Sequence, residues 1–311
     1  MTTARYSVDV SPDHVYADAG TRPLRVDLFL PRGTRQRPPL IVWLHAGGWR
    51  VGDRKRAPDL STRFAACGFA MSSIDYRLSR EAKFPAQLDD VKSALRWLRD
   101  NAERFGFDAR RIGLWGSSAG GHLAALAALG ARDAHDPPPA VRAVVVGYAP
   151  IDFLRMDAQR NHDLSTVDDP TAFAPPPGAF TADADSYESL LIGAPIEERP
   201  DLVRAASPLT YVRPGAPPFL IVHGMSDVAV PSQQSVMLFE ALARCGNDVT
   251  LQLVEGLGHG FLDRDDFELG PRRRVETYRA DGGTTEHTGD GPPLTFDGIE
   301  AFFRRHLGGD T

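Results

Sequence analysis

Short apolar runs of strand length alternate with helical patterns along most of this chain, and the alternation limits the folds open to it. Strands separated by helices pair in parallel and form a sheet that helices cover on both faces. We therefore expect an α/β fold with a mostly parallel, eight-stranded sheet, in a single domain that spans residues 1–311. The runs that indicate strands are Leu24–Leu30, Leu40–Leu44, Phe69–Ile74, Ile112–Trp115, Ala143–Tyr148, Phe219–His223 and Val249–Val254.

Helices are indicated where apolar residues recur at steps of three and four. The clearest pattern covers Pro85–Phe105 and stops at Gly106, a residue type that commonly ends helices. Two further patterns cover Ser232–Cys245 and the C-terminal stretch from Phe296 to Leu307. Their apolar stripes are typical of helices that pack on a sheet.

Two longer segments interrupt the alternation. Residues 152–207 are rich in Asp, Pro and Ala and lie between the sixth and seventh strands of the expected sheet. An insertion of this length is either a lid or a disordered excursion, and we expect a small cap. The second segment, Arg264–Pro293, is polar and weakly periodic. It is predicted to form a loop beside the site described next.

The residues Gly116–Gly121, with the sequence Gly-Ser-Ser-Ala-Gly-Gly, stand between the strand run Ile112–Trp115 and a helical pattern over Leu123–Leu129. A GxSxG nucleophile elbow requires this strand–turn–helix context and small residues around its sharp turn. The turn exposes the central serine at a helix N-terminus, where backbone N–H groups favour developing negative charge. Only Ser118 fits that position. A glycine-rich turn without catalysis is the alternative.

The segment His45–Trp49, with the sequence His-Ala-Gly-Gly-Trp, follows an apolar strand run. Glycines let the backbone approach a substrate closely, and an HGGG-type loop supplies N–H groups to a tetrahedral oxyanion. We therefore expect the N–H groups of Gly47, Gly48 and Ala119 to form an oxyanion hole. His45 is expected either to brace this loop or to pack as an ordinary strand-end histidine.

A serine hydroxyl is a poor nucleophile at neutral pH, so Ser118 needs a general base, and the base needs a group that fixes its tautomer. His259 follows the strand run Val249–Val254 in a glycine-containing loop, and Asp227 follows Phe219–His223. The chain order Ser118, Asp227, His259 matches the order known for serine hydrolases with this kind of sheet. A surface histidine and a turn-capping aspartate are the ordinary alternatives.

Together these residues make the chain resemble the α/β-hydrolase superfamily, and within it the hormone-sensitive-lipase-like carboxylesterases and the related feruloyl and acetyl-xylan esterases and kynurenine formamidases. The resemblance covers nearly the whole chain. It implies an α/β-hydrolase fold and a cofactor-free acyl-transfer enzyme, in which Trp49 is a candidate substrate contact. Ala46 replaces the first glycine of the HGGG pattern, and its methyl group argues against bulky tertiary-alcohol esters. The matching segments are His45–Trp49, Gly52-Asp53, Asp75–Leu78, Gly116–Gly121, His223–Asp227 and Gly258–Phe261.

The expected function is that of a serine carboxylesterase that hydrolyses small soluble esters, with short to medium acyl chains, through an acyl-enzyme on Ser118. The polar character of residues 152–207 argues against the large apolar lid of a lipase. Two other functions stay open. One is an amide hydrolase of the kynurenine-formamidase or aminopeptidase type on the same triad, and the other is a catalytically silent fold used for binding.

Charge and composition bear on partners and location. The formal net charge is −6 and the 35 basic residues are dispersed, which argues against a nucleic-acid partner. Cys67 and Cys245 lack metal-ligand spacing, so neither a disulfide framework nor a metal site is expected. No secretory pattern or membrane-length apolar run is visible, so we expect a cytoplasmic protein without membrane contact. The oligomeric state stays open, with a homodimer as one candidate.

Overall fold

The computed structural model describes residues 6–20, 22–130, 141–160, 179–264 and 266–308. Within these residues ten strands form one sheet. They are β1 (Val8–Asp18), β2 (Pro23–Pro31), β3 (Pro39–Leu44), β4 (Ala70–Ile74), β5 (Asp108–Ser117), β6 (Val141–Gly147), β7 (Phe219–Gly224), β8 (Val249–Val254), β9 (Val275–Asp281) and β10 (Thr284–Thr288). The seven helices of the same residues are α1 (Ala86–Phe105), α2 (Ala119–Ala128), α3 (Phe153–Gln159), α4 (Tyr187–Ile192), α5 (Pro200–Ala206), α6 (Gln233–Arg244) and α7 (Phe296–Leu307).

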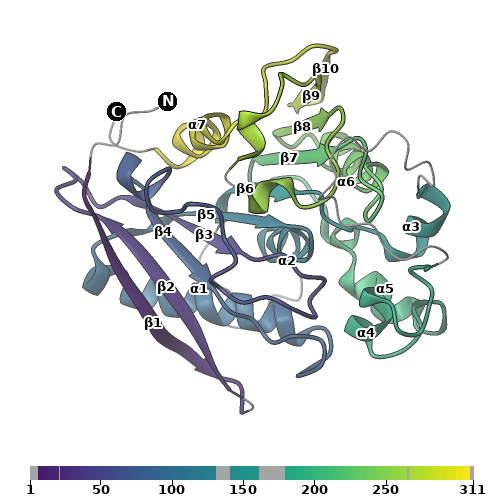
Figure 1. The fold of residues 1–311 in the computed structure, drawn as a ribbon, viewed down its shortest axis with the longest axis horizontal. Coiled ribbons are helices and arrows are strands. Elements are labelled where there is room, and N and C mark those ends of the chain that lie inside the picture. The colour runs from purple at the N-terminus through teal and green to yellow at the C-terminus, as the bar shows by residue number, and fades with distance from the viewer. Residues whose placement is uncertain (1–5, 21, 131–140, 161–178, 265, 309–311) are drawn as a thin grey trace.

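The strand order is β1-β2-β4-β3-β5-β6-β7-β8-β9-β10. The pairs from β4 through β8 are parallel, whereas β2, β1, β9 and β10 are added antiparallel. Figure 1 shows β1 and β2 at one end of the sheet and β9 and β10 at the other. The mostly parallel sheet predicted from sequence is therefore confirmed. The described chain has two strands more than the eight expected.

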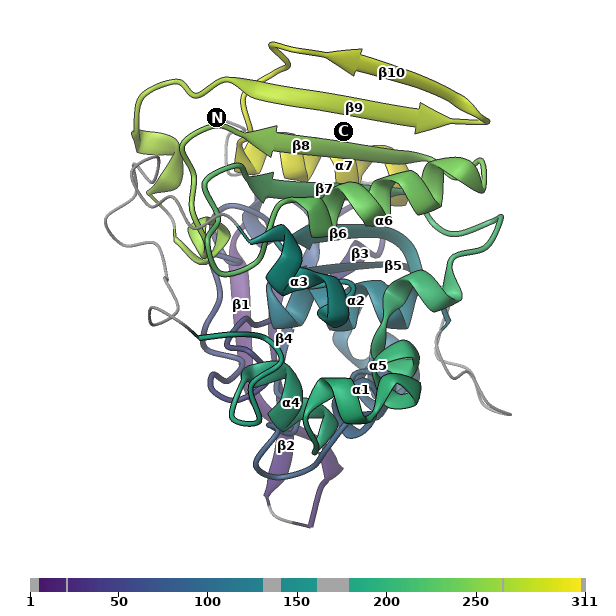
Figure 2. The same cartoon turned by 90° about the vertical axis from the view of Figure 1, so that its right-hand side faces the viewer.

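Helices cover both faces of the sheet, as the apolar stripes predict. Helices α1, α2 and α6 pack on one face and bury residues such as Leu95, Leu123 and Leu238 in the larger core. Helix α7 packs on the opposite face through Phe296, Ile299 and Phe303; Figure 2 shows it behind the sheet, with α6 in front. The predicted helices over 85–105, 232–245 and 296–307 are thus present within one residue at each end.

The insertion between β6 and β7 contains the short helices α3, α4 and α5. The Pro175–Pro177 run, which helped to define this insertion in the sequence, lies outside the described residues. A contact between helices ties the insertion to the main domain: the buried His122 of α2 donates a hydrogen bond from Nε2 to the carbonyl oxygen of Ala206, at 2.7 Å. The insertion is therefore anchored beside the helix that follows the Ser118 turn.

The prediction of a loop over Arg264–Pro293 is wrong for part of that segment. Strand β9 pairs antiparallel with β8, and β10 pairs antiparallel with β9. Gly282 and Gly283 join the two strands with φ angles of 55° and 89°, which a two-residue hairpin turn needs and glycine adopts without strain. The polar character that suggested a loop belongs to β10, an exposed edge strand whose residues all face solvent.

Candidate active site

Ser118 lies in the turn between β5 and α2, where the chain reverses sharply. Its φ of 52° is positive, a conformation that costs a non-glycine residue on the order of 1–3 kcal/mol and that the surrounding structure must enforce. Its N–H donates to the carbonyl oxygen of Gly147 at 2.8 Å, which pins the turn to β6. A side chain at Gly120 would put its Cβ 2.0 Å from the carbonyl oxygen of Leu44. The small residues of the motif are therefore required by close packing under the turn.

Three side chains from separate loops form a continuous hydrogen-bonded chain. His259 Nε2 lies 2.9 Å from Ser118 Oγ, and His259 Nδ1 lies 2.7 Å from Asp227 Oδ2. Because the carboxylate can only accept, Nδ1 holds the proton and Nε2 presents a lone pair to the serine hydroxyl. The structure thus brings together the three residues that the sequence analysis selected.

Asp227 is fixed in its orienting position by the backbone. Its Oδ1 accepts hydrogen bonds from the N–H groups of Ala229 and Val230, each at 2.9 Å, and its side chain is fully buried. Burial alone would raise the pKa of this carboxyl, but the adjoining imidazoles of His259 and His223 outweigh it and hold the pKa well below its usual range. Asp227 is therefore ionised at neutral pH, where its negative charge can orient and stabilise the imidazole of His259.

The glycine loop after β3 has the backbone shape that the sequence predicts. Gly47 has a φ of 123°, and a Cβ there would lie 2.0 Å from the carbonyl oxygen of Val51. The left-handed backbone begins at Gly47, one residue after Ala46, and continues through Gly48 to Trp49. This register explains why an alanine is accommodated at position 46 of the pattern.

His45 lies beneath the loop and not in the pocket. Its Nδ1 donates to the carbonyl oxygen of Ala46 at 2.7 Å, and its ring stacks on Tyr76 with centroids 4.2 Å apart. The Tyr76 hydroxyl in turn donates to the carbonyl oxygen of His45 at 2.7 Å. Burial lowers the pKa of His45 to about 4, so the imidazole is neutral at physiological pH. These contacts support the glycine loop from below.

The remaining residues proposed from sequence have unequal access to the site. Ala119 opens α2, so its N–H belongs to the first turn, where N–H groups lack acceptors within the helix. Trp49 lines the pocket wall but is only 1% exposed, and its indole packs against His122 and Phe153. Most of the Trp49 ring thus supports the wall from behind.

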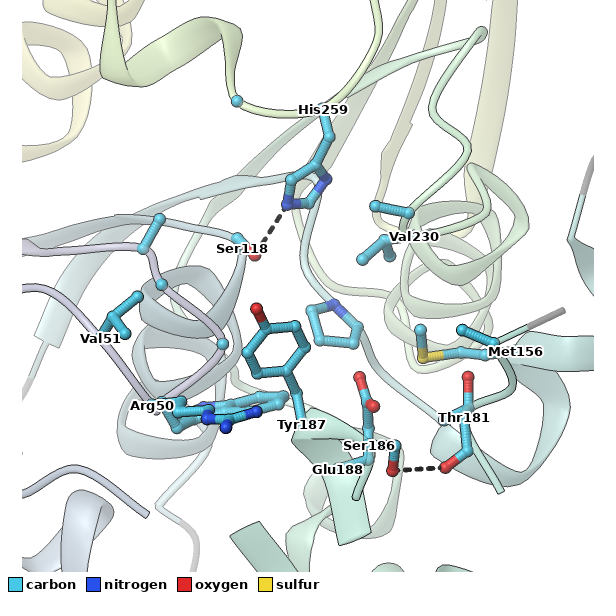
Figure 3. A pocket seen from close by; sticks show the side chains of 18 of the residues that line it. Arg50, Val51, Ser118, Met156, Thr181, Ser186, Tyr187, Glu188, Val230 and His259 are labelled. Carbon is cyan, nitrogen blue, oxygen red and sulfur yellow. Dashed lines mark hydrogen bonds between the residues drawn. The ribbon is translucent and has the colours of Figure 1, made fainter. Parts of the chain in front are cut away.

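A cavity of about 830 Å³ opens at Ser118 and His259 (Figure 3). The glycine loop forms one wall, and residues of the insertion form another. Figure 3 shows Tyr187, Ser186 and Thr181 around the end of the cavity that the insertion supplies. Sequence reasoning did not find these insertion residues, because the segment has no motif and its packing depends on contacts distant in the chain.

Asp263 is a second feature that the sequence did not reveal. Its Oδ1 accepts a hydrogen bond from Ser117 Oγ at 2.5 Å, and its Oδ2 pairs with Arg56 Nε at 3.1 Å. These contacts fasten the segment after His259 to both the Ser118 turn and the chain that follows the glycine loop. Tyr148 adds a ring contact to His259, with centroids 4.8 Å apart. The imidazole is therefore held from several directions.

Replacing Asp263 with alanine is expected to lower kcat by about 10- to 100-fold, because an ångström-scale displacement of a catalytic group has an effect of this size. KM should change less, since most of the pocket wall is retained. Steady-state kinetics with p-nitrophenyl butyrate would measure both. Asp201→Ala, which removes an exposed partner of Arg199, is the control. An unchanged kcat in folded Asp263→Ala protein would show that the loop holds His259 without this carboxylate.

The described residues contain neither a membrane-spanning helix nor a cluster of metal-ligand side chains. No helix within them combines the length and apolar character that crossing a bilayer requires. Among the same residues, no group of three or more His, Cys, Asp or Glu side chains is arranged to hold a metal ion.

Known proteins of similar sequence provide evidence that is independent of this geometry. Esterase LipC of Mycobacterium tuberculosis is 34% identical over 242 residues, which cover 75% of this chain and 55% of LipC. The chain thus spans about half the length of the curated relatives it matches.

Solved structures match over more of their length. A truncated carbohydrate esterase from gut microbiota superposes with a TM-score of 0.71 at 25% identity and covers 98% of both chains. Esterase 2 of Thermogutta terrifontis, in a butyrate-bound form, gives a TM-score of 0.62 at 27% identity over 82% of this chain and 85% of its own. Both neighbours share the α/β-hydrolase-like architecture described above.

The family model named BD-FAE matches residues 26–242, a range that includes the glycine loop, the Ser118 turn and Asp227. This match covers more than two thirds of the chain, and it agrees with the relatives and the fold. The chain belongs to the BD-FAE family of α/β-hydrolase esterases.

Proposed function

We propose that this protein hydrolyses carboxylic esters through an acyl-enzyme on Ser118, with His259 as general base and Asp227 as the group that orients it. The observation that supports this most directly is the hydrogen-bonded chain from Ser118 Oγ through His259 to Asp227, which opens into a cavity. A binding module would not need a strained serine aligned on an imidazole whose tautomer is fixed. LipC of Mycobacterium tuberculosis and esterase 2 of Thermogutta terrifontis, which the chain resembles, are named as esterases.

In the first step Ser118 Oγ attacks the ester carbonyl while His259 Nε2 takes the hydroxyl proton. Negative charge develops on the carbonyl oxygen, and the N–H groups of Gly47, Gly48 and Ala119 lie on the loop and helix turn that flank Ser118. Each such donor is worth on the order of 100- to 1,000-fold in turnover. His259 then gives its proton to the departing alcohol oxygen, which leaves the acyl group bound to Ser118.

In the second step water replaces the alcohol. His259 removes a proton from the water, the hydroxyl oxygen attacks the acyl carbonyl, and the proton returns to Ser118 Oγ as the acid leaves. Asp227 stays ionised throughout and stabilises the imidazolium that forms in each step. This chemistry needs no cofactor, because His259 takes up a proton and gives it back within each of the two steps.

The cavity supports small substrates. Its volume of about 830 Å³ lies within the usual range for small-molecule sites, roughly 300–1,000 Å³. The related esterase 2 of Thermogutta terrifontis is described with bound butyrate, a short acid. We therefore infer that the preferred esters have short to medium acyl chains.

Labelling and turnover together test this function. A fluorophosphonate probe should add once per chain, at Ser118, as intact mass and peptide mapping would show. Turnover of p-nitrophenyl acetate, butyrate and octanoate should exceed that of the long-chain palmitate ester by at least about tenfold, since one methylene too many in a hydrophobic pocket costs about 10- to 200-fold. N-formylkynurenine tested beside them separates ester from amide hydrolysis. A folded protein without adduct or turnover would favour the silent binding module.

A further inference from the structure

A carboxyl group faces the substrate from the insertion. Figure 3 shows the Glu188 side chain extending from α4 into the same cavity that Ser118 enters. The residue is only 8% exposed, and what exposure it has is toward this cavity. A buried acid in this place is unusual, because Glu is rarely buried unless it is paired.

The described residues give this carboxyl little compensation. Within the described residues it accepts no hydrogen bond from another residue, and no cation forms an ion pair with it. Arg160 is near enough to act on it, but Arg160 already pairs with Asp157 and donates to Thr181 Oγ1 at 3.3 Å. The neighbouring Ser186 hydroxyl donates to the carbonyl oxygen of Thr181 instead. Glu188 is thus left with hydrogen-bonding capacity that points into the cavity.

We propose that Glu188 binds a hydroxyl group of the substrate, so that the preferred substrates are neutral esters that carry a hydroxyl on the acid or the alcohol part. This inference rests on the proposed ester hydrolysis and names its substrate class. A hydroxyl both donates and accepts a hydrogen bond, so it can pair with Glu188 in either protonation state.

The charges of the cavity favour a neutral partner over an ion. An ammonium group at Glu188 would be repelled by the nearby Arg160, and a carboxylate would be repelled by Glu188 once it ionises. Burial raises the pKa of Glu188 to about 7, so near neutral pH the group is only partly ionised. The charged side chains that line the cavity are balanced in number: Arg50, Arg56, Arg160 and Arg264 against Asp183, Asp185, Glu188 and Asp263.

Matched substrates test the preference on both sides of the ester bond. Methyl butyrate is compared with methyl 3-hydroxybutyrate, and butyl acetate with its terminal-hydroxyl analogue. The quantity measured is the ratio of kcat/KM for the hydroxylated ester to that for the plain ester. In at least one pair we expect this ratio to fall about tenfold or more when Glu188 is replaced by methionine, because a hydrogen bond of ordinary strength corresponds to about that factor.

Two further variants separate hydrogen bonding from charge and from general effects. Glu188→Gln keeps a neutral donor and acceptor of the same size, so it should retain most of the preference for the hydroxyl. Glu197→Met removes an exposed glutamate outside the cavity and should leave the ratio unchanged. Comparing ratios between variants cancels the different chemical reactivities of the esters.

The pH dependence of the ratio gives a second readout. As the pH rises through about 7, Glu188 ionises, and a plain alkyl chain beside it would then bury an unpaired carboxylate. The ratio should therefore rise with pH in the wild type and stay flat in Glu188→Gln, because any ionisation that affects both esters equally cancels in the ratio. The charged groups that face Glu188 are Arg160 and Asp157, with Asp183 and Asp185 in the same wall.

The outcomes distinguish this inference from the proposed function. Ester hydrolysis with a ratio that Glu188→Met does not change would overturn the hydroxyl site and leave the esterase intact. Loss of the ratio in Glu188→Gln as well would show that charge is recognised, which also overturns it. No hydrolysis of any ester would overturn both. If Glu188→Met does not fold, the pH dependence in the wild type against Glu188→Gln decides alone.

Discussion

Turnover of p-nitrophenyl butyrate is expected to fall by about 10⁴- to 10⁶-fold when Ser118 is replaced by alanine, the range seen when a serine nucleophile is removed. The change deletes the one oxygen atom that is hydrogen-bonded to His259 Nε2, at 2.9 Å. It leaves the glycine loop and the first turn of α2 in place, so any residual rate would come from oxyanion stabilisation alone. Progress curves at high enzyme concentration would measure it.

The matched control is Ser93→Ala in α1, where the hydroxyl donates to the carbonyl oxygen of Asp89 and accepts a hydrogen bond from Arg96, away from the site. It should turn over substrate like the wild type. Thermal unfolding would show that Ser118→Ala is folded. The substitution should not relieve the backbone strain at position 118, because alanine is as restricted as serine at a positive φ. Retention of more than a few per cent of activity by Ser118→Ala would remove Ser118 from the mechanism.

Replacement of Asp227 with asparagine should lower kcat by about 10⁴-fold. Asparagine has the same shape but an amide that can donate to His259 Nδ1, and the imidazole then places its proton on Nε2. In that tautomer Nε2 has no lone pair for the Ser118 hydroxyl. The N–H groups of Ala229 and Val230 can still bond the amide oxygen, so the local backbone is kept.

Probe labelling would check that Asp227 acts by orienting His259. Labelling of Ser118 by the fluorophosphonate should slow in parallel with turnover, since both need an activated hydroxyl. Asp100→Asn, which alters an exposed ion pair with Arg99, is the control. A loss of less than tenfold in folded Asp227→Asn protein would mean that another group orients His259, and His223, 3.3 Å from the same carboxylate, would be examined first.

The nucleophile and its neighbours were predictable because short, local sequence motifs identify them. A sharp strand-to-helix turn admits few sequences, and Gly120 has no room for any other side chain. Asp227 and His259 were found from their place after strands, since the carboxyl ends of parallel strands gather at one edge of a sheet. Whether these atoms were within hydrogen-bonding distance could only come from the structure.

Other parts could not be predicted, for two physical reasons. Asp263 makes its contacts with residues far away in the chain, and Glu188 lines the cavity because the insertion packs beside distant segments. Nothing in the local sequence marks either residue. The β9–β10 hairpin is a different case, because Asp281-Gly282-Gly283-Thr284 is a recognisable turn signal. Its edge strand is polar on both sides, so the apolar runs that identified β2 to β8 have no counterpart there.

The pairing of Val254 with Val275 has a consequence for how this family could diversify. The chain leaves the sheet at the end of β8, passes through His259 and returns to the neighbouring strand, so both ends of the excursion are fixed beside each other. Closing a longer excursion costs little, about 0.6 kcal/mol for each doubling of its length. Residues could therefore be inserted or deleted near the exposed Leu269 without moving His259, which Asp263 holds separately. Changes in the length of this loop, in evolution or by engineering, could therefore alter the mouth of the pocket without displacing the catalytic residues.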